Sequence, residues 1–154
     1  TYGLPGLRIG WLASHQKKLL AKVQMLKDYT TICSSAASEF LAEVALRQRL
    51  WLAERSRRQI KANLVLLDEF FDRHADLFEW QRPKAGPIAF PRLLGRDVEP
   101  FCEDLALQAG VLLLPGTLYD HPGNHFRIGF GRRNLPEALQ KFETYLRNGE
   151  SYER

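Results

Sequence analysis

Two arginines, Arg8 and Arg127, lie in segments whose composition suits the binding of an anion. Arg127 belongs to a predicted strand over residues 125–130, and the side chains of a strand alternate between its two faces. The two phenylalanines and the isoleucine of this strand should enter the core, and Arg127 should point to the opposite face beside Gly129. A guanidinium there can hold a planar carboxylate through two parallel hydrogen bonds. The alternatives are an exposed arginine on an edge strand and a structural salt bridge.

Arg8 follows a segment, residues 1–7, in which Gly3, Pro5 and Gly6 disfavour a helix. Glycines let the backbone come close to a ligand, and the donors of an arginine match the oxygens of a phosphate. The segment therefore suits a phosphate contact, and a tight turn without a ligand is the alternative.

The other reactive side chains give weaker signals. His121 and His125 are four residues apart, but a proline and a glycine lie between them, so no helix sets both on one face and no metal site is expected. Cys33 and Cys102 have neither metal nor redox spacing, and we interpret them as free buried thiols in a reducing cytoplasm. No residue of this chain is assigned a catalytic role.

The composition is that of a globular protein, since 154 residues of which 45% are apolar allow one substantial core. No apolar run is long enough to cross a membrane, and the N-terminus has no signal-peptide pattern. The net charge is +4, with a basic cluster at Arg55, Arg57, Arg58 and Lys61. Because no aromatic residues are interleaved with it, the cluster is interpreted as a solvated helix face and not as a nucleic-acid site.

The spacing of apolar residues predicts several helices, one of them long. They are expected from a Ser14 cap to near residues 29–33, from a Ser38 cap through Leu46, from about Arg49 to about Arg73, from an Asp97 cap through Gln108, and from a capping box at Asn134 and Glu137. The core stripe of the long helix should be Leu52, Ile60, Leu64, Leu67 and Phe71.

Short strands are predicted between these helices. Residues 8–13 form one, residues 77–80 and 87–93 should pair across a turn, and residues 111–114 suit a strand covered on both faces. With residues 125–130 the chain is predicted to be α+β, with four or five short strands in a small sheet packed with several helices.

Four segments, in this order, resemble the class I/II aminotransferases, pyridoxal-phosphate enzymes of fold type I. Residues 1–11 (Thr-Tyr-Gly-Leu-Pro-Gly-Leu-Arg-Ile-Gly-Trp) are similar to the stretch after the lysine that bonds the cofactor. Residues 34–38 resemble the family's small-residue loop before a helix. Residues 113–117 resemble its Pro-Gly-Ser/Thr turn, and residues 125–128 its last strand. The match covers nearly the whole chain.

The resemblance implies roles for both arginines. Arg8 would contact the cofactor phosphate if the Schiff-base lysine immediately precedes Thr1, and Arg127 would bind the substrate α-carboxylate. Residues 1–30 would be a remnant of the large cofactor domain and the start of the connecting helix, and residues 31–154 the small C-terminal domain. Because this sequence holds no lysine at the required point, the chain alone is expected to be inactive.

The whole enzyme would transfer an amino group between an amino acid and a 2-oxo acid with pyridoxal phosphate, as a cytoplasmic homodimer without nucleic-acid or membrane partners. A lyase, decarboxylase or cyclase of the same fold is an alternative, because such enzymes share both arginine segments. Two non-enzymatic alternatives are the aminotransferase-like domain of a transcriptional regulator and a free-standing binding module.

Overall fold

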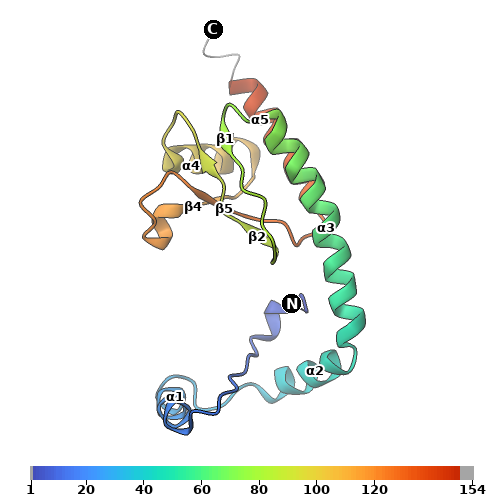
Figure 1. The fold of residues 1–154 in the computed structure, drawn as a ribbon, viewed down its shortest axis with the longest axis vertical. Coiled ribbons are helices and arrows are strands. Elements are labelled where there is room, and N and C mark those ends of the chain that lie inside the picture. The colour runs from blue at the N-terminus through green and yellow to red at the C-terminus, as the bar shows by residue number, and fades with distance from the viewer. Residues whose placement is uncertain (1, 150–154) are drawn as a thin grey trace. The chain divides into compact units, whose positions relative to one another are not determined.

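The computed structural model describes residues 2–149 and divides into two compact units, one up to Arg55 and one from Ser56 (Figure 1). Each unit is described by itself. The boundary falls inside helix α3 (Arg49–Arg73), the long helix whose bounds were predicted from the sequence. The predicted division at residue 30 concerns domains of a larger enzyme and stays a prediction, and Thr1 and residues 150–154 lie outside the described residues.

The first unit contains a short 3-10 helix, η1 (Pro5–Leu7), and the helices α1 (Lys17–Thr30) and α2 (Ala36–Arg47). The expectation that residues 1–7 hold no helix was wrong for this single turn, because proline is accepted at a helix start. The strand predicted over residues 8–13 was also wrong: no described strand pairs with this segment. The cap of α2 is Ser35, whose hydroxyl accepts from the Ser38 N–H, and not Ser38.

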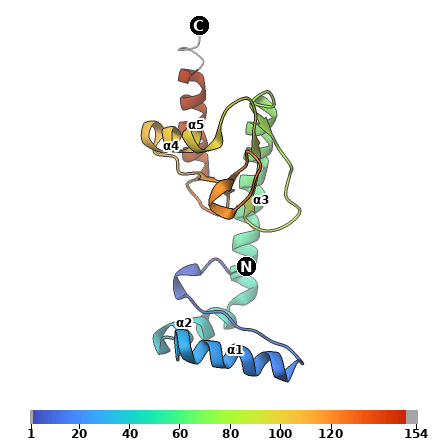
Figure 2. The same ribbon diagram turned by 90° about the vertical axis from the view of Figure 1, so that its left-hand side faces the viewer.

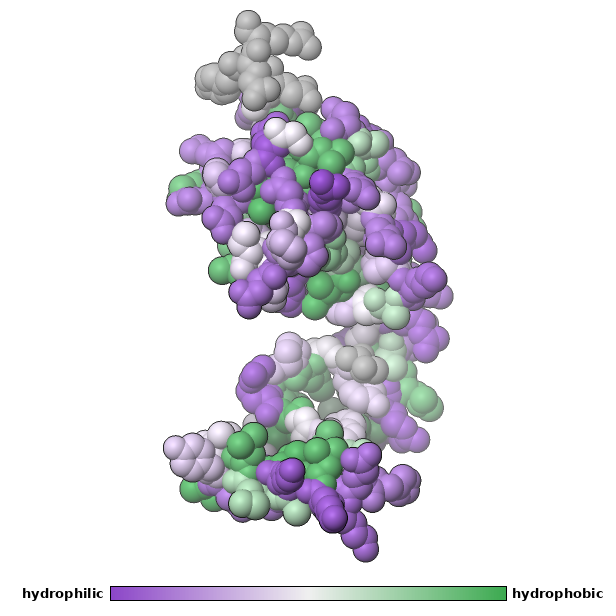
Figure 3. All heavy atoms as spheres, turned by 60° about the vertical axis from the view of Figure 1, so that its left-hand side comes forward, coloured by the Kyte–Doolittle hydropathy of each residue, from purple (hydrophilic) through white to green (hydrophobic). Residues whose placement is uncertain are grey.

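This first unit buries little of its apolar surface. Leu52 is buried in it, but most of the large apolar side chains of α1 and α2 lie exposed, and Figure 3 shows green patches in the lower part of the view. The large exposed side chains of the whole unit include Trp11, Met25, Tyr29, Phe40 and Trp51. Helices α1 and α2 are amphipathic by sequence, and the described part of this unit has no core that covers their apolar sides.

The second unit holds the rest of α3 together with α4 (Val98–Ala109) and α5 (Leu135–Gly149). As predicted, Asp97 caps α4 by accepting from the Glu99 N–H, and Gly110 ends it in the left-handed conformation. Helices α4 and α5 pack together (Figure 2). Of the predicted α3 stripe all members but Ile60 are buried, and Ile60 is half-buried against the core.

The strands form two sheets where one was predicted. Strand β1 (Phe78–Glu79) pairs antiparallel with β3 (Arg92–Leu93), while β2 (Ile88–Ala89), β5 (Phe126–Gly129) and β4 (Leu114–Pro115) form a second sheet in the order β2-β5-β4. The predicted strand at residues 87–93 is thus shared between both sheets. The prediction of a doubly covered strand at residues 111–114 was wrong, because Leu112 is exposed. The α+β class with five short strands is confirmed for the described residues.

Phenylalanines dominate the core of the second unit. The rings of Phe70, Phe71, Phe78, Phe126 and Phe142 are almost fully buried, and Phe70 and Phe142 lie with centroids 4.9 Å apart. Rings at this spacing and tilt contribute beyond the area that they bury. The core is therefore built where β1, β5, α3 and α5 meet.

The two cysteines differ from the prediction that both are buried. Cys102 on α4 is buried, and burial raises the pKa of its thiol to about 11. Cys33 is exposed, because it follows α1 in the unit that has little core. Among the described helices, none is long and apolar enough to span a membrane.

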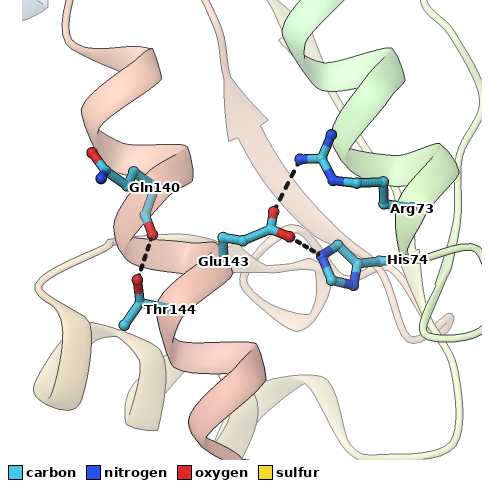
Figure 4. Close-up of polar contacts among 5 residues, drawn as sticks. All are labelled: Arg73, His74, Gln140, Glu143 and Thr144. Atoms are coloured by element: carbon cyan, nitrogen blue, oxygen red, sulfur yellow. Dashed lines mark hydrogen bonds and ion pairs between the residues drawn. The ribbon is translucent and has the colours of Figure 1, made fainter.

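Glu143 joins the end of α3 to α5 (Figure 4). Its carboxylate accepts from Arg73 Nη2 at 3.1 Å and from His74 Nε2 at 3.0 Å. Burial raises the pKa of Glu143, but the two hydrogen bonds and the charges of Arg73 and His74 outweigh burial, so that the pKa is lowered. The ionised carboxylate is thus the form that the fold favours.

We call the contacts of Glu143 with Arg73 and His74 the Glu143 clamp. The clamp should make the free energy of unfolding depend on pH. Its contribution is present above the ordinary glutamate pKa of 4.5 and is lost as the pH falls through the lowered folded value. We expect Glu143→Gln to reduce the free energy of unfolding at pH 7 by about 0.5–1 kcal/mol, since the pair is partly exposed. In urea unfolding this difference should shrink below pH 4.5.

Glu137→Gln, on the same helix, is the matched control. Glu137 pairs with Lys141 at 3.0 Å in an exposed i,i+4 geometry, so its loss should change stability less. If the difference in free energy of unfolding between wild type and Glu143→Gln stays constant from pH 7 to pH 3, the proposed role of the Glu143 clamp is contradicted.

Candidate functional site

Arg127 lies on the central strand of the three-stranded sheet. Its Cα faces that of Leu114 on β4, and Ile128 faces Ala89 on β2. Phe126 and Ile128 are buried while Arg127 is half-buried on the other face, as the alternation predicted. The alternative of an arginine on an edge strand is therefore excluded.

Among the described residues, the Arg127 guanidinium has one polar contact. Its Nη1 donates to the Tyr119 hydroxyl at 3.0 Å, and no carboxylate among residues 2–149 forms an ion pair with it. A Cβ added to Gly129 would meet nothing within 4 Å, so the sheet face beside Arg127 is open. The described part of the chain gives no support to a structural salt bridge.

The loop after β4 carries Tyr119 to this face. It forms a 3-10 helix, η2 (Gly116–Tyr119), and turns at Asp120 in the left-handed conformation. Gly116 donates its N–H to the His125 carbonyl at 2.6 Å, and an added Cβ would come within 2.9 Å of that oxygen. Only glycine allows this approach, so the Pro-Gly turn noted in the sequence fixes η2 against the start of β5.

An aromatic group lies beside Tyr119. The Phe90 ring stacks on His125 with centroids 5.3 Å apart and meets Tyr119 edge-on at 6.3 Å. His121 and His125 have ring centroids 4.5 Å apart. We name Phe90, Tyr119, His121 and His125 the aromatic patch.

The two histidines of the aromatic patch are differently bonded. His121 Nδ1 accepts from the Gly123 N–H at 3.1 Å, so its proton lies on Nε2 when the ring is neutral. His125 Nδ1 is buried without a hydrogen-bond partner in the described structure. Desolvation, then the charges of His121 and Arg92, lower the pKa of His125, and Glu79 opposes them. The described residues contain no group of three side chains suited to a metal ion.

Asn63 anchors the other end of β5. Its side chain is 2% exposed, and its Nδ2 donates to the carbonyls of Phe130 at 2.8 Å and Arg132 at 2.7 Å. Asn63 lies within α3, so the strand that carries Arg127 is tied to a helix of its own unit. Sequence reasoning missed Asn63, and its polar side chain within the apolar stripe was the available signal.

Arg8 lies in the first unit. It directly follows η1, where its N–H donates to the Pro5 carbonyl and its φ of 53° is left-handed. Its side chain is exposed and has neither a hydrogen bond nor an ion pair with any described residue. A free guanidinium beside a glycine-rich turn fits the phosphate end of a cofactor. Since Arg8 and Arg127 belong to different units, their convergence on one pocket stays a prediction.

One family model matches most of the chain. The model of aminotransferase class I and II matches residues 1–142. The chain is 31% identical to a PLP-dependent aminotransferase from Streptococcus suis, with a TM-score of 0.84 over 96% of this chain and 40% of that one. It is 33% identical to the PLP-dependent cyclase OrfR, with a TM-score of 0.82 over 96% of this chain and 41% of that one.

A curated relative gives a similar coverage. Capreomycidine synthase of Streptomyces vinaceus is 33% identical over 96% of this chain and 39% of its own length. The chain therefore spans about two fifths of the length of these three relatives.

The environment of His125 predicts a lowered pKa that can be measured. In an NMR titration its ring should become protonated below the ordinary value of 6.5, and His121→Gln should move the midpoint back toward 6.5. Because the folded pKa is lowered, the contribution to stability is present above pH 6.5 and is lost as the pH falls through the folded value. A His125 midpoint above 6.5 would contradict the burial of its ring nitrogen.

Proposed function

The chain belongs to the class I and II aminotransferases, and we propose that its protein transfers an amino group between an amino acid and a 2-oxo acid with pyridoxal phosphate. The observation that carries the proposal is Arg127: a half-buried guanidinium on a central strand, facing an open surface without a carboxylate partner among the described residues. A guanidinium placed in this way has donors available for the carboxylate of a ligand.

Arg127 would bind the α-carboxylate of the substrate. Two parallel hydrogen bonds from a guanidinium fix both the position and the plane of a carboxylate. The orientation of the carboxylate then decides which bond at the α-carbon is aligned for cleavage. Tyr119 and the rest of the aromatic patch would line the space beside this carboxylate.

Arg8 would hold the phosphate of the cofactor. Its exposed guanidinium has donors free for phosphate oxygens, and the preceding glycine-containing turn leaves room, since a Cβ at Gly6 would meet nothing within 4 Å. When bound, pyridoxal phosphate supplies an electron sink for the charge that develops at the α-carbon. The lysine that bonds the cofactor, a homodimer and a cytoplasmic location stay predictions.

A cyclase is the second candidate function. The similarity to the PLP-dependent cyclase OrfR, at 33% identity, is comparable to that of the Streptococcus suis aminotransferase. Both reactions need the α-carboxylate held, so Arg127 serves either. Identifying the products formed from each amino acid, with and without a 2-oxo acid, separates them: an aminotransferase needs the 2-oxo acid for continued turnover and a cyclase does not.

Arg127→Ala should weaken amino-acid binding by about a hundredfold, because a charged, bidentate contact is lost. Cofactor absorbance should persist, because Arg127 is not assigned to the cofactor. The measurement is a substrate titration of the holoenzyme followed by absorbance. Arg82→Ala is the control, since Arg82 pairs with Asp68 at 2.7 Å in the same unit. Unchanged turnover of Arg127→Ala would remove this residue from the site.

Arg8→Ala should weaken the cofactor and leave the substrate carboxylate contact intact. We expect the dissociation constant of pyridoxal phosphate to rise about tenfold, as for loss of one charge-assisted hydrogen bond. The measurement is equilibrium dialysis of cofactor from the enzyme. Arg47→Ala, which removes an exposed arginine paired with Glu43 in the same unit, should leave this constant unchanged. Equal retention of cofactor by both variants would overturn the assignment of Arg8.

A further inference from the structure

Among the described residues, the Tyr119 hydroxyl is the polar partner of the Arg127 guanidinium. We propose that Tyr119 is a positioning residue: it accepts from Arg127 Nη1 at 3.0 Å, fixes the guanidinium, and donates its own proton to the carboxylate that Arg127 binds. The inference rests on the proposed function, because it assumes that Arg127 meets a substrate carboxylate.

The hydrogen-bonding capacity of the two groups permits this. A guanidinium has five N–H donors, and the contact with Tyr119 uses one of them. A phenol has one donor and accepts at its oxygen, so accepting from Arg127 leaves the Tyr119 O–H available. No described residue accepts that proton. An anion bound by Arg127 is therefore the natural acceptor for it.

The Tyr119 ring is held by its place at the end of η2 and by the Phe90 ring. Phe90 meets Tyr119 edge-on and stacks on His125, which precedes β5. The backbone of η2 is fixed by the Gly116 N–H to His125 carbonyl bond. Tyr119 is nevertheless 47% exposed, so its hydroxyl is accessible to a ligand.

Tyr119 would strengthen the binding of a carboxylate by restricting the Arg127 side chain before the ligand arrives. A free arginine side chain loses rotamer freedom when it binds a ligand, and this loss opposes binding. A guanidinium that is already fixed loses less. Removing only the Tyr119 oxygen should therefore weaken carboxylate ligands and spare ligands without a carboxylate.

The test uses the holoenzyme and two ligands. The first is the α-methyl analogue of the amino acid with the highest turnover in a screen of the twenty, which has no α-proton and so binds without transamination. The second is the corresponding primary amine without a carboxylate. For Tyr119→Phe, calorimetry should show the first ligand weakened about five- to tenfold, as for one hydrogen bond, and the second unchanged.

Tyr145→Phe is the matched control. It removes a tyrosine hydroxyl from the same unit, but one that donates to Asp104 at 2.7 Å on α4. Neither ligand should respond to it. Equal weakening of both ligands by Tyr119→Phe, or of neither, overturns the positioning role.

A double variant tests whether Tyr119 acts through Arg127. In the Arg127→Ala background, Tyr119→Phe should cause no further loss, and a full additive loss would overturn the inference. The proposed function fails separately, if Arg127→Ala itself leaves the α-methyl ligand unaffected or if none of the twenty amino acids is turned over. If Arg127→Ala weakens the ligand and Tyr119→Phe does not, only the role of Tyr119 is lost.

Discussion

The two-residue repeat of strand β5 is the constraint on which the site depends. Phe126 and Ile128 are held in the core, so Arg127 between them has to face the other side of the sheet. A shift of one residue in register would bury the guanidinium in the apolar core and expose Phe126 and Ile128, which is strongly unfavourable. The ties at both ends, from Gly116 to His125 and from Asn63 to Phe130, keep the strand in this register.

The regular parts of the second unit were predictable because local signals agreed with the packing. The long α3, the Asp97-capped α4 and the inward face of β5 all follow from period and capping residues. The division of residues 87–93 between two sheets was not predictable, since strand partners are chosen by tertiary contacts. Pro91 between the two short strands is the local sign of the break.

The sequence predicted the position of Arg127 in the candidate site but not the residues that surround it. Alternation along the strand placed Arg127, but the contact with Tyr119 depends on a loop whose shape comes from one close backbone approach at Gly116. In the first unit, the strand expected at residues 8–13 failed for a related reason. A strand exists only with a partner, and no described segment provides one there.

The contrast between the cysteines gives each unit a natural reporter of its own. Cys33 belongs to the first unit and is exposed, while Cys102 in the second is buried with its ionisation suppressed. A buried thiol such as that of Cys102 reacts only when its surroundings open transiently. Its modification rate then measures the free energy of that opening. Local fluctuations of the part that carries Arg127 can therefore be followed chemically without introducing any label site.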